Sequence, residues 1–329
     1  MCSKLFLIGL LTITILTGCG KSKSASSSES TTQEGYLDPI AMEATNIQQE
    51  AAALQTALTP VQPTYLSPEA SGALVESNDR AIIDYSNTSE GYVMVQYIGS
   101  TQSRLKAQVQ GPATTYTYNI TVGEWTVFPL SDGDGDYQIK VFENISDNRY
   151  ALILSVSTNV ALKNEFAPFL YPNQYVNYEN ATQTIATAEL LTQSQTDLLG
   201  KVESVYNYVV DNISYDNEKA ATVQSGYLPD LDHVLTTGKG ICFDYASLMT
   251  GMLRSQGIPC KLVVGYAGSA YHAWISVWSE ETGWVDGAVF FDGTTWQRMD
   301  PTFASTGNKD SSIMEFIGDG TNYTEKYLY

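Results

Sequence analysis

Three residues of the chain could together perform nucleophilic catalysis: Cys242, His272 and Asp300. A cysteine thiolate attacks a carbonyl carbon, a histidine beside it transfers the proton, and an aspartate holds the histidine ring in one tautomer. The three residues follow one another within residues 237–304, each in a recognisable local setting. We therefore predict a triad with Cys242 as nucleophile, His272 as base and Asp300 as its partner.

Cys242 begins a helical pattern directly behind the glycine-rich stretch TGKGI. The apolar residues that follow recur at helical spacing on one face: Tyr245, Ala246, Met249, Met252 and Leu253. Gly257 and Pro259 then end the pattern. Unpaired N–H groups and the positive end of the helix dipole stabilise an anion at a helix N-terminus. We therefore expect the Cys242 thiol to have a lowered pKa and to be reactive at neutral pH.

His272 and Asp300 are each predicted to lie on or beside a β-strand. Residues 271–278 alternate in polarity, which is typical of a strand, and place His272 on the face that also carries Trp274. Asp300 ends a second short strand, residues 296–300. Asp286 is another candidate partner for His272, but it lies in an Asp-Gly turn, so Asp300 is expected to be held more rigidly.

The segments GKGICFDYASLMTGMLRSQGIPC, YHAWISVW and MDPTF resemble the transglutaminase-like superfamily, in the order and spacing of that family. The resemblance covers roughly the last 150 residues, the usual size of one domain. It implies an α+β domain with a helix-then-sheet core and papain-type chemistry at Cys242, His272 and Asp300. It also implies that a residue near Tyr215 lines the site. The short Cys-to-His spacing argues against true papain order.

The implied reaction is acyl transfer through a thioester at Cys242, passing the acyl group to an amine or to water. The backbone N–H of Cys242 and one unidentified donor would hold the oxyanion. The reaction needs no metal or organic cofactor. The resembling family includes transamidases, peptidases and inactive relatives, so a cysteine peptidase and a non-catalytic surface binding protein remain alternatives.

The remaining cysteine and histidine of the C-terminal half have structural interpretations. Cys260 precedes the apolar run Leu262–Val264 and is expected to be buried. A disulfide to Cys242 is not expected, because the intervening helix would hold the two residues roughly 20 Å apart. His233 falls in a loop before the glycine-rich stretch and is expected at the surface.

The N-terminus predicts an exported, lipid-anchored protein. Residues 5–16 form an apolar run behind Lys4, too short for a comfortable membrane span and typical of a signal peptide. The sequence Leu-Thr-Gly-Cys that ends at Cys19 resembles a bacterial lipobox. It implies a signal peptide over residues 1–18 and a lipid-modified Cys19 that anchors the protein at the extracellular face of the cell membrane. Residues 19–74 are then a tether and linker.

The acidic composition argues against some partners. The 329 residues, enough for two ordinary domains plus tails, include 17 Lys+Arg against 36 Asp+Glu, a formal net charge of −19. Nucleic acids and anionic membrane surfaces both favour basic patches, so neither is expected to bind the protein surface. A protein or peptide substrate outside the cell is compatible with this charge.

Residues 75–162 are predicted to form an immunoglobulin-like β-sandwich in front of the catalytic domain at 163–329. Seven short segments alternate in polarity and are separated by turn residues: Ala81–Tyr85, Tyr92–Ile98, Leu105–Val109, Thr115–Ile120, Trp125–Phe128, Tyr137–Glu143 and Tyr150–Ser157. The stretch 132–143 imitates a calcium loop, but Tyr137 stands where that loop needs glycine, and an Asp/Gly hairpin turn explains it as well.

Three other segments complete the expected organisation. Residues 41–58 are compatible with a marginal helix, and residues 164–182 are rich in Pro, Tyr and Asn, typical of a connection between domains. Leu198–Val210 carries a clear amphipathic stripe and is predicted to be a helix. The tail from Ser311 is expected to end in an edge strand.

Overall fold

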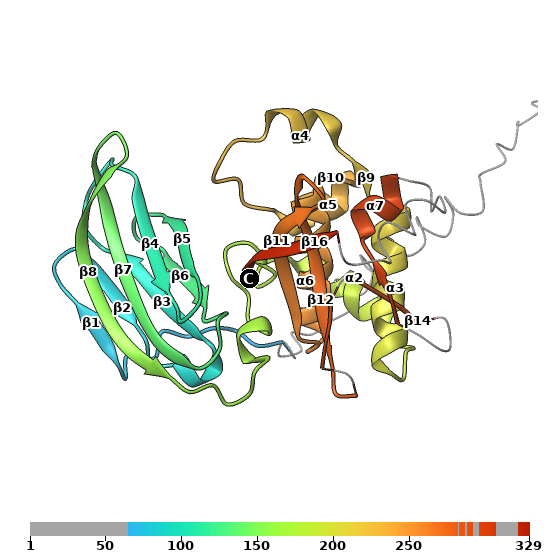
Figure 1. Ribbon diagram of the computed structural model, residues 1–329, viewed down its shortest axis with the longest axis horizontal. Coiled ribbons are helices and arrows are strands. Elements are labelled where there is room, and N and C mark those ends of the chain that lie inside the picture. The colour runs from blue at the N-terminus through green and yellow to red at the C-terminus, as the bar shows by residue number, and fades with distance from the viewer. Residues whose placement is uncertain (1–64, 282, 287, 292–295, 307–321) are drawn as a thin grey trace, which may run out of the picture. The chain divides into compact units, whose positions relative to one another are not determined.

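The computed structural model describes residues 65–281, 283–286, 288–291, 296–306 and 322–329. The predicted signal peptide, the lipobox Cys19 and the predicted helix 41–58 lie outside these residues. The described chain has an α+β fold of antiparallel sheets and short helices (Figure 1). No helix in this part of the chain is both long and apolar enough to cross a membrane.

The first eight strands form two four-stranded antiparallel sheets. They are β1 (Val75–Ser77), β2 (Ala81–Asp84), β3 (Tyr92–Tyr97), β4 (Leu105–Gln110), β5 (Thr115–Ile120), β6 (Trp125–Pro129), β7 (Gly135–Ser146) and β8 (Arg149–Val160). One sheet has the order β1-β2-β3-β6 and the other β5-β4-β7-β8. The seven predicted segments are all strands, and the unpredicted β1 is short, with all three residues exposed.

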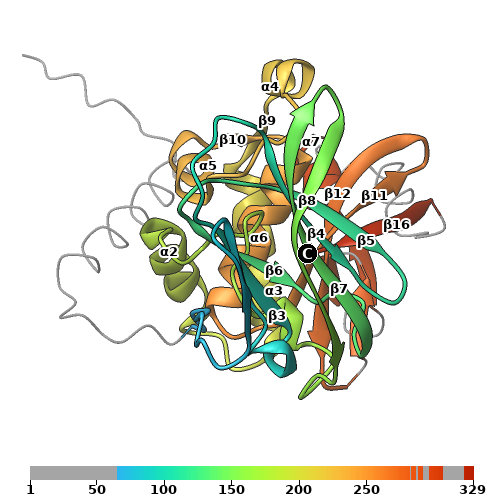
Figure 2. The same ribbon diagram turned by 90° about the vertical axis from the view of Figure 1, so that its left-hand side faces the viewer.

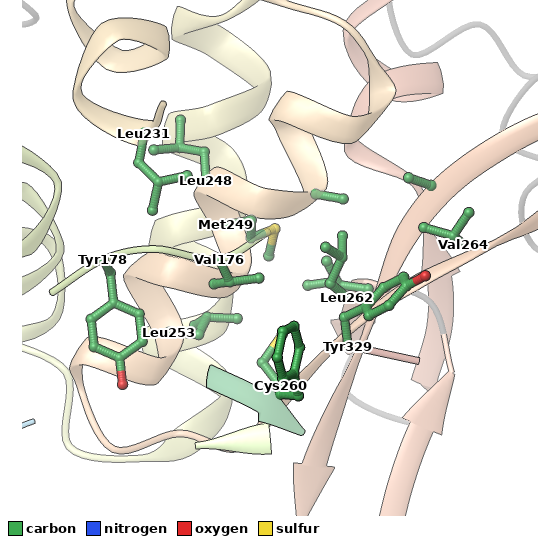
Figure 3. Close-up of a cluster of buried hydrophobic side chains, with 14 of the residues drawn as sticks. Val176, Tyr178, Leu231, Leu248, Met249, Leu253, Cys260, Leu262, Val264 and Tyr329 are labelled. Atoms are coloured by element: carbon green, nitrogen blue, oxygen red, sulfur yellow. The ribbon is translucent and has the colours of Figure 1, made fainter. Parts of the chain in front are cut away.

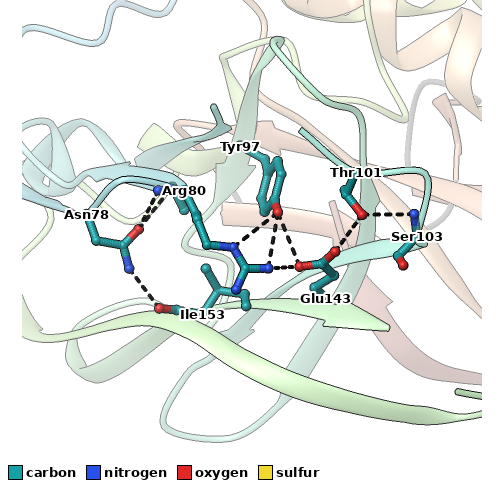
Figure 4. Close-up of polar contacts among 8 residues, drawn as sticks. Asn78, Arg80, Tyr97, Thr101, Ser103, Glu143 and Ile153 are labelled. Atoms are coloured by element: carbon teal, nitrogen blue, oxygen red, sulfur yellow. Dashed lines mark hydrogen bonds and ion pairs between the residues drawn. The ribbon is translucent and has the colours of Figure 1, made fainter. Parts of the chain in front are cut away.

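The two sheets, drawn in Figures 1 and 2, share one apolar core to which both contribute buried side chains. Alternate residues of β4 and of its neighbour β5 are buried, which is the period-two pattern that the sequence displays. A polar network lies between the two sheets at one end. Arg80, which precedes β2, pairs with Glu143 of β7, and the hydroxyl of Tyr97 of β3 donates to Glu143 at 3.2 Å (Figure 4). The immunoglobulin-like class and the limits 75–162 and 163–329 stay predictions.

The calcium-like motif has a structural role at its first aspartate. The carboxylate of Asp132 accepts the backbone N–H groups of Ala113 and Thr114 at 2.9 and 2.6 Å, and the hydroxyl of Tyr116 at 3.1 Å. It therefore holds the β4–β5 hairpin turn. The hairpin turn expected there is wrong, because the motif connects β6 of one sheet to β7 of the other, continuing directly into β7 at Gly135.

The C-terminal half combines helices with a four-stranded antiparallel sheet. Its helices are α2 (Thr182–Thr192), α3 (Leu198–Asn212), α4 (Asn217–Thr222), α5 (Leu231–Thr237), α6 (Cys242–Ser255) and α7 (Pro301–Thr306). Its strands are β9 (Ser214–Tyr215), β10 (Lys239–Gly240), β11 (Cys260–Ala267), β12 (Ala270–Ser279), β13 (Gly283–Asp286), β14 (Ala288–Phe291), β15 (Trp296–Met299) and β16 (Tyr323–Leu328). The main sheet has the order β13-β12-β11-β16, so β16 is the expected edge strand.

Helix α6 is the central element of this half. It packs on strands β11 and β12 and contacts helices α2, α3 and α5. Its buried Leu248, Met249 and Leu253 meet Leu262 and Val264 of β11 in one cluster (Figure 3). Because α6 is enclosed by a sheet and by helices, its first residue is held in a fixed place relative to the strands.

One helix of this half was missed, and one expectation needs correction. Helix α2 begins at Thr182, the last residue of the expected connection, and was not predicted. Its buried side chains are small, Thr and Ala only, so no apolar stripe indicates it. His233 lies on helix α5 and not in a loop, although it is exposed as expected. Trp274, on the same face of β12 as His272, is 1% exposed and packs on Tyr323 with ring centroids 5.0 Å apart.

A buried arginine ties the core together behind α6. Arg254 is fully buried and donates to the backbone oxygens of Cys260 at 2.8 Å, Tyr171 at 2.7 Å and Tyr329 at 2.6 Å. Burial lowers its pKa to about 10, so the guanidinium still carries its charge at neutral pH. Arg254 therefore joins α6 to the first residue of β11 and to the end of the chain.

Candidate active site

The turn before Cys242 needs glycine at two positions. Gly238 ends α5 in the left-handed region at φ 60°, which glycine adopts at least cost. A Cβ on Gly240 would come within 2.7 Å of Cβ of Asp244, too close for any other residue. Gly240 also takes part in the parallel β9–β10 pair, where it lies opposite Tyr215. These constraints fix the path of the turn, so that α6 begins beside Tyr215.

Cys242 is the first residue of α6, as predicted, and its thiol is free and half-buried. A residue at this position has a backbone N–H that no carbonyl of the preceding turn can accept, so it can donate to an oxyanion. The N-terminus of α6 is capped by Asp244, whose carboxylate accepts a hydrogen bond from the N–H of Ile241 at 2.8 Å. The nucleophile candidate therefore lies on a rigid helix terminus.

His272 and Asp300 meet in the interior. His272 lies on β12 opposite Gly265 and is 6% exposed, and Asp300 directly follows β15 and is 1% exposed. Nε2 of His272 lies 2.5 Å from Oδ2 of Asp300. The carboxylate also accepts the N–H of Thr302 at 3.0 Å and the hydroxyl of Tyr323 at 3.2 Å. Because Nε2 is bonded to Asp300, Nδ1 is the ring nitrogen that can interact with the Cys242 thiol.

The surroundings of His272 favour its charged form. Burial lowers its pKa, but the charge and hydrogen bond of Asp300 and the neighbouring Cys242 sulfur outweigh burial and raise the pKa to about 10. The ring is therefore an imidazolium at neutral pH, placed between a thiol and a carboxylate. A cation there can stabilise a thiolate and can give a proton to a leaving group.

Cys242 and His272 both line one cavity of about 500 Å³. Its other lining residues are Tyr175, Tyr215, Ala220, Val223, Gln224, Ser225, Gly226, Tyr227, Ile241, Phe243, Val264, Tyr271, Ala273 and Tyr329. Apart from Cys242 and His272, the lining is neutral, and six of its members are aromatic. The pKa of Tyr215 is raised by burial and by the charge of Cys242, so its hydroxyl remains a donor near the sulfur.

The other candidates from the sequence lie elsewhere. Asp286 ends β13 opposite Ser276, four residues along β12 from His272, a separation of roughly 13 Å along the strand. Asp300 rather than Asp286 is therefore the residue that meets His272. His233 is exposed on α5, and its backbone N–H is bonded to Asp230 at 3.0 Å. Cys260 is fully buried, and Cys19 lies outside the described residues.

Sequence reasoning missed several residues of the site. Tyr175 and Tyr329 line the cavity from distant parts of the chain, and no local pattern marks them. Tyr323 on the edge strand β16 was not linked to Asp300. Asp244 had a detectable signal, because a carboxylate at the third position of a helix is a capping signature.

The comparisons with known proteins agree with the resemblance. Residues 185–301 match the family model of the transglutaminase-like superfamily. These residues therefore form a transglutaminase-like domain. The match includes Cys242, His272 and Asp300 and ends one residue after the last of them.

Three relatives illustrate the range of similar proteins. The uncharacterized protein YebA of Bacillus subtilis is 24% identical over 210 residues, 56% of this chain and 27% of that protein. The protein-glutamine gamma-glutamyltransferase of Pseudomonas aeruginosa is 34% identical over 68 residues, 16% of this chain and 10% of that protein. The periplasmic domain of TgpA from P. aeruginosa has a TM-score of 0.34 and 17% identity, covering 74% of this chain and 79% of that one. The match thus spans about a quarter of YebA and a tenth of the glutamyltransferase.

Proposed function

We propose that the protein is a thiol-dependent acyltransferase that acts on protein or peptide carboxamides through a thioester at Cys242. The observation that carries this proposal is the position of His272. Its Nε2 is bonded to the buried Asp300, and its other side faces Cys242 in a cavity with a neutral lining. A transglutaminase-like domain containing all three residues supports the same chemistry.

The first half of the reaction forms the thioester. The thiolate of Cys242 attacks the carboxamide carbon, the carbon–sulfur bond forms, and the carbonyl oxygen becomes an oxyanion. The backbone N–H of Cys242 and the hydroxyl of Tyr215 are the donors we assign to that oxyanion. The carbon–nitrogen bond then breaks, and the departing nitrogen takes the proton of the His272 imidazolium, leaving as an amine or ammonia.

The second half returns the enzyme to its starting state. Neutral His272 accepts a proton from an incoming amine or water as that group attacks the thioester carbon. The carbon–sulfur bond breaks, releasing a new amide or a carboxylic acid, and Cys242 leaves as the thiolate beside the restored imidazolium. Asp300 keeps the ring in one orientation throughout and stabilises its charge.

The test measures turnover of two kinds of substrate. Purified protein is given N-benzyloxycarbonyl-glutaminylglycine with cadaverine, and separately an internally quenched peptide, in the wild type, Cys242→Ala and the matched control Cys260→Ser. Amine incorporation that is lost only in Cys242→Ala supports a transamidase. Cleavage of the peptide without any amine supports the peptidase alternative. Equal behaviour of all three proteins would refute catalysis by Cys242 and favour the non-catalytic binding protein.

We also propose that the protein is anchored at the extracellular face of a bacterial membrane through a lipid on Cys19. The lipobox-like sequence supports this location, and a neutral cavity and acidic composition suit a protein or cell-wall peptide substrate there. Metabolic labelling with an alkyne fatty acid should mark the wild type and not Cys19→Ser. Labelling of both proteins, or of neither, would refute the anchor at Cys19.

For residues 75–162 we propose an immunoglobulin-like module that supports the catalytic domain. Without β1, its sheets have the orders β2-β3-β6 and β5-β4-β7-β8, a seven-strand arrangement of that general type. Tyr118 of β5 packs on Tyr175 and Tyr329, which line the cavity, with ring centroids 5.8 and 6.0 Å apart. Tyr118→Ala should therefore raise the KM for the carboxamide donor more than half-buried Tyr150→Ala does.

A further inference from the structure

One buried carboxylate links the helix of the nucleophile to a neighbouring segment of the chain. Asp244 is fully buried, and its capping bond to Ile241 uses only part of its capacity. Its Oδ2 also accepts Nζ of Lys219 at 2.7 Å, and its Oδ1 accepts the hydroxyl of Tyr227 at 2.6 Å. Lys219 and Tyr227 are bonded to each other at 2.6 Å. A buried charge so fully paired is a strong, directional anchor.

Lys219 and Tyr227 belong to a segment, residues 217–227, that has little other support. Helix α4 has no buried residue, residues 223–226 are exposed, and α4 projects from the neighbouring helices in both views (Figures 1 and 2). Among the described residues, the hydrogen bonds that side chains of residues 217–227 make outside this segment all end on Asp244, and Asp216 caps the start of α4 through the backbone N–H of Lys219 at 2.8 Å. The anchor therefore decides where this segment lies.

The same segment forms one wall of the cavity that contains Cys242. Its lining residues are Ala220, Val223, Gln224, Ser225, Gly226 and Tyr227. The wall therefore offers the substrate apolar surface, an amide and hydroxyls, and no charge. The facing walls come from β12, from the start of α6 and from the C-terminal residue, all held by buried packing.

We propose that residues 217–227 are the specificity-determining wall of the acyl-donor pocket, and that Asp244, Lys219 and Tyr227 are the positioning residues that hold it. The wall selects carboxamide donors whose neighbouring residues are uncharged, because a lysine or glutamate side chain there would lose water without gaining a partner. Lys219 itself is engaged by Asp244 and so does not offer its charge to the substrate. This inference rests on the proposed acyltransferase function.

The test removes the anchor and leaves the triad in place. Lys219→Met and Tyr227→Phe each delete one bond to Asp244, and exposed Lys239→Met and Tyr266→Phe are the matched controls. The donors are the amides of acetylated Ala-Gln-Ala, Lys-Gln-Lys and Glu-Gln-Glu, with cadaverine as the amine. We expect the wild type to prefer Ala-Gln-Ala. In the two anchor variants, the KM for Ala-Gln-Ala should rise about tenfold, and kcat should stay within about twofold of the wild type. The preference for Ala-Gln-Ala over the charged donors should shrink.

A second readout keeps the inference separate from turnover. Cys242 is alkylated with iodoacetamide, which is small, and with N-benzyl-chloroacetamide, which needs the pocket. In the anchor variants, the rate of alkylation by iodoacetamide should stay at the wild-type value. The ratio of the N-benzyl-chloroacetamide rate to the iodoacetamide rate should fall below the wild-type ratio. If no protein turns over any donor, the acyltransferase proposal fails while this ratio still tests the wall. Anchor variants that match the controls in donor preference and in the ratio would overturn it, as would equal loss of both alkylation rates.

Discussion

The two cysteines of the C-terminal half lie at opposite ends of helix α6 and have contrasting surroundings. Cys242 begins α6, is half-buried in a cavity, and faces a histidine whose ring is bonded to an aspartate. Cys260 begins β11 behind the same helix, is fully buried, and its thiol lies 3.6 Å from the hydroxyl of Thr250 (Figure 3). Burial raises the pKa of Cys260 to about 12. The reactivity of a thiol here follows from its neighbours and its access, not from residue type.

Removal of the His272 imidazole should have the largest effect on the difference in reactivity between Cys242 and Cys260. His272→Ala deletes the proton donor and the cation beside Cys242, and we expect kcat/KM for amine incorporation to fall by about 10⁴-fold. Iodoacetamide labelling of Cys242 at pH 7, followed by mass spectrometry, should slow in parallel, with Cys260 as the internal unlabelled control. Unchanged labelling of Cys242 would show that His272 does not activate it.

Asp300→Asn should have the next largest effect. The amide keeps the size of the carboxylate but cannot stabilise the imidazolium, so kcat/KM should fall by at least about 10²-fold. Its pH profile should also change, because the charge that raises the pKa of His272 is gone. Asp286→Asn is the matched control and should retain activity. Equal losses in both variants would contradict the assignment of Asp300 as the partner.

Arg254→Met should expose the second cysteine. The substitution removes the guanidinium donor from the backbone oxygens of Cys260, Tyr171 and Tyr329, of which that of Tyr329 keeps the N–H of Leu262 at 2.9 Å. We expect the free energy of unfolding to fall by about 3 kcal/mol, roughly a 100-fold change in the equilibrium, measured by urea titration. Cys260 should become labelled by iodoacetamide through transient opening, whereas exposed Arg149→Met should change neither quantity. An unlabelled Cys260 would show that Arg254 does not protect it.

The pH dependence of the stability that His272 contributes has a definite sign. The folded protein holds the His272 proton to about pH 10, against an ordinary value near 6.5. The resulting stabilisation is complete below pH 6.5 and is lost as pH rises to about 10. The urea midpoint of the wild type, compared with that of His272→Gln, should therefore converge over this range. A difference that grows with pH would contradict a raised pKa.

Cys260→Ser should have the smallest effect on function. The hydroxyl fits the buried position poorly, so some loss of stability is expected, about 1–3 kcal/mol, while kcat/KM should stay within about twofold. A large loss of activity with an unchanged urea midpoint would mean that Cys260 takes part in the reaction.

The elements that carry local periodicity were predictable. The seven strands of residues 81–160 and the start of α6 at Cys242 follow from alternation, helical spacing and glycine punctuation. Helix α2 was not predictable, because it buries threonine and alanine in place of a large apolar stripe. Within the site, Cys242, His272 and Asp300 could be chosen from their local settings, and the structure brings them together. Tyr175 and Tyr329 could not, since they reach the cavity only through long-range packing.

The amino-acid sequence was sufficient to indicate the candidate chemistry, because a cysteine at a helix start, a histidine on a strand and an aspartate at a strand end are all local features. The folded arrangement was needed to bury Arg254 and Trp274 and to place Lys219 and Tyr227 on Asp244. Each of these outcomes depends on contacts between segments far apart in the chain. Neither periodicity nor spacing carries information about such contacts, since they form only when α6 packs between its sheet and its neighbouring helices.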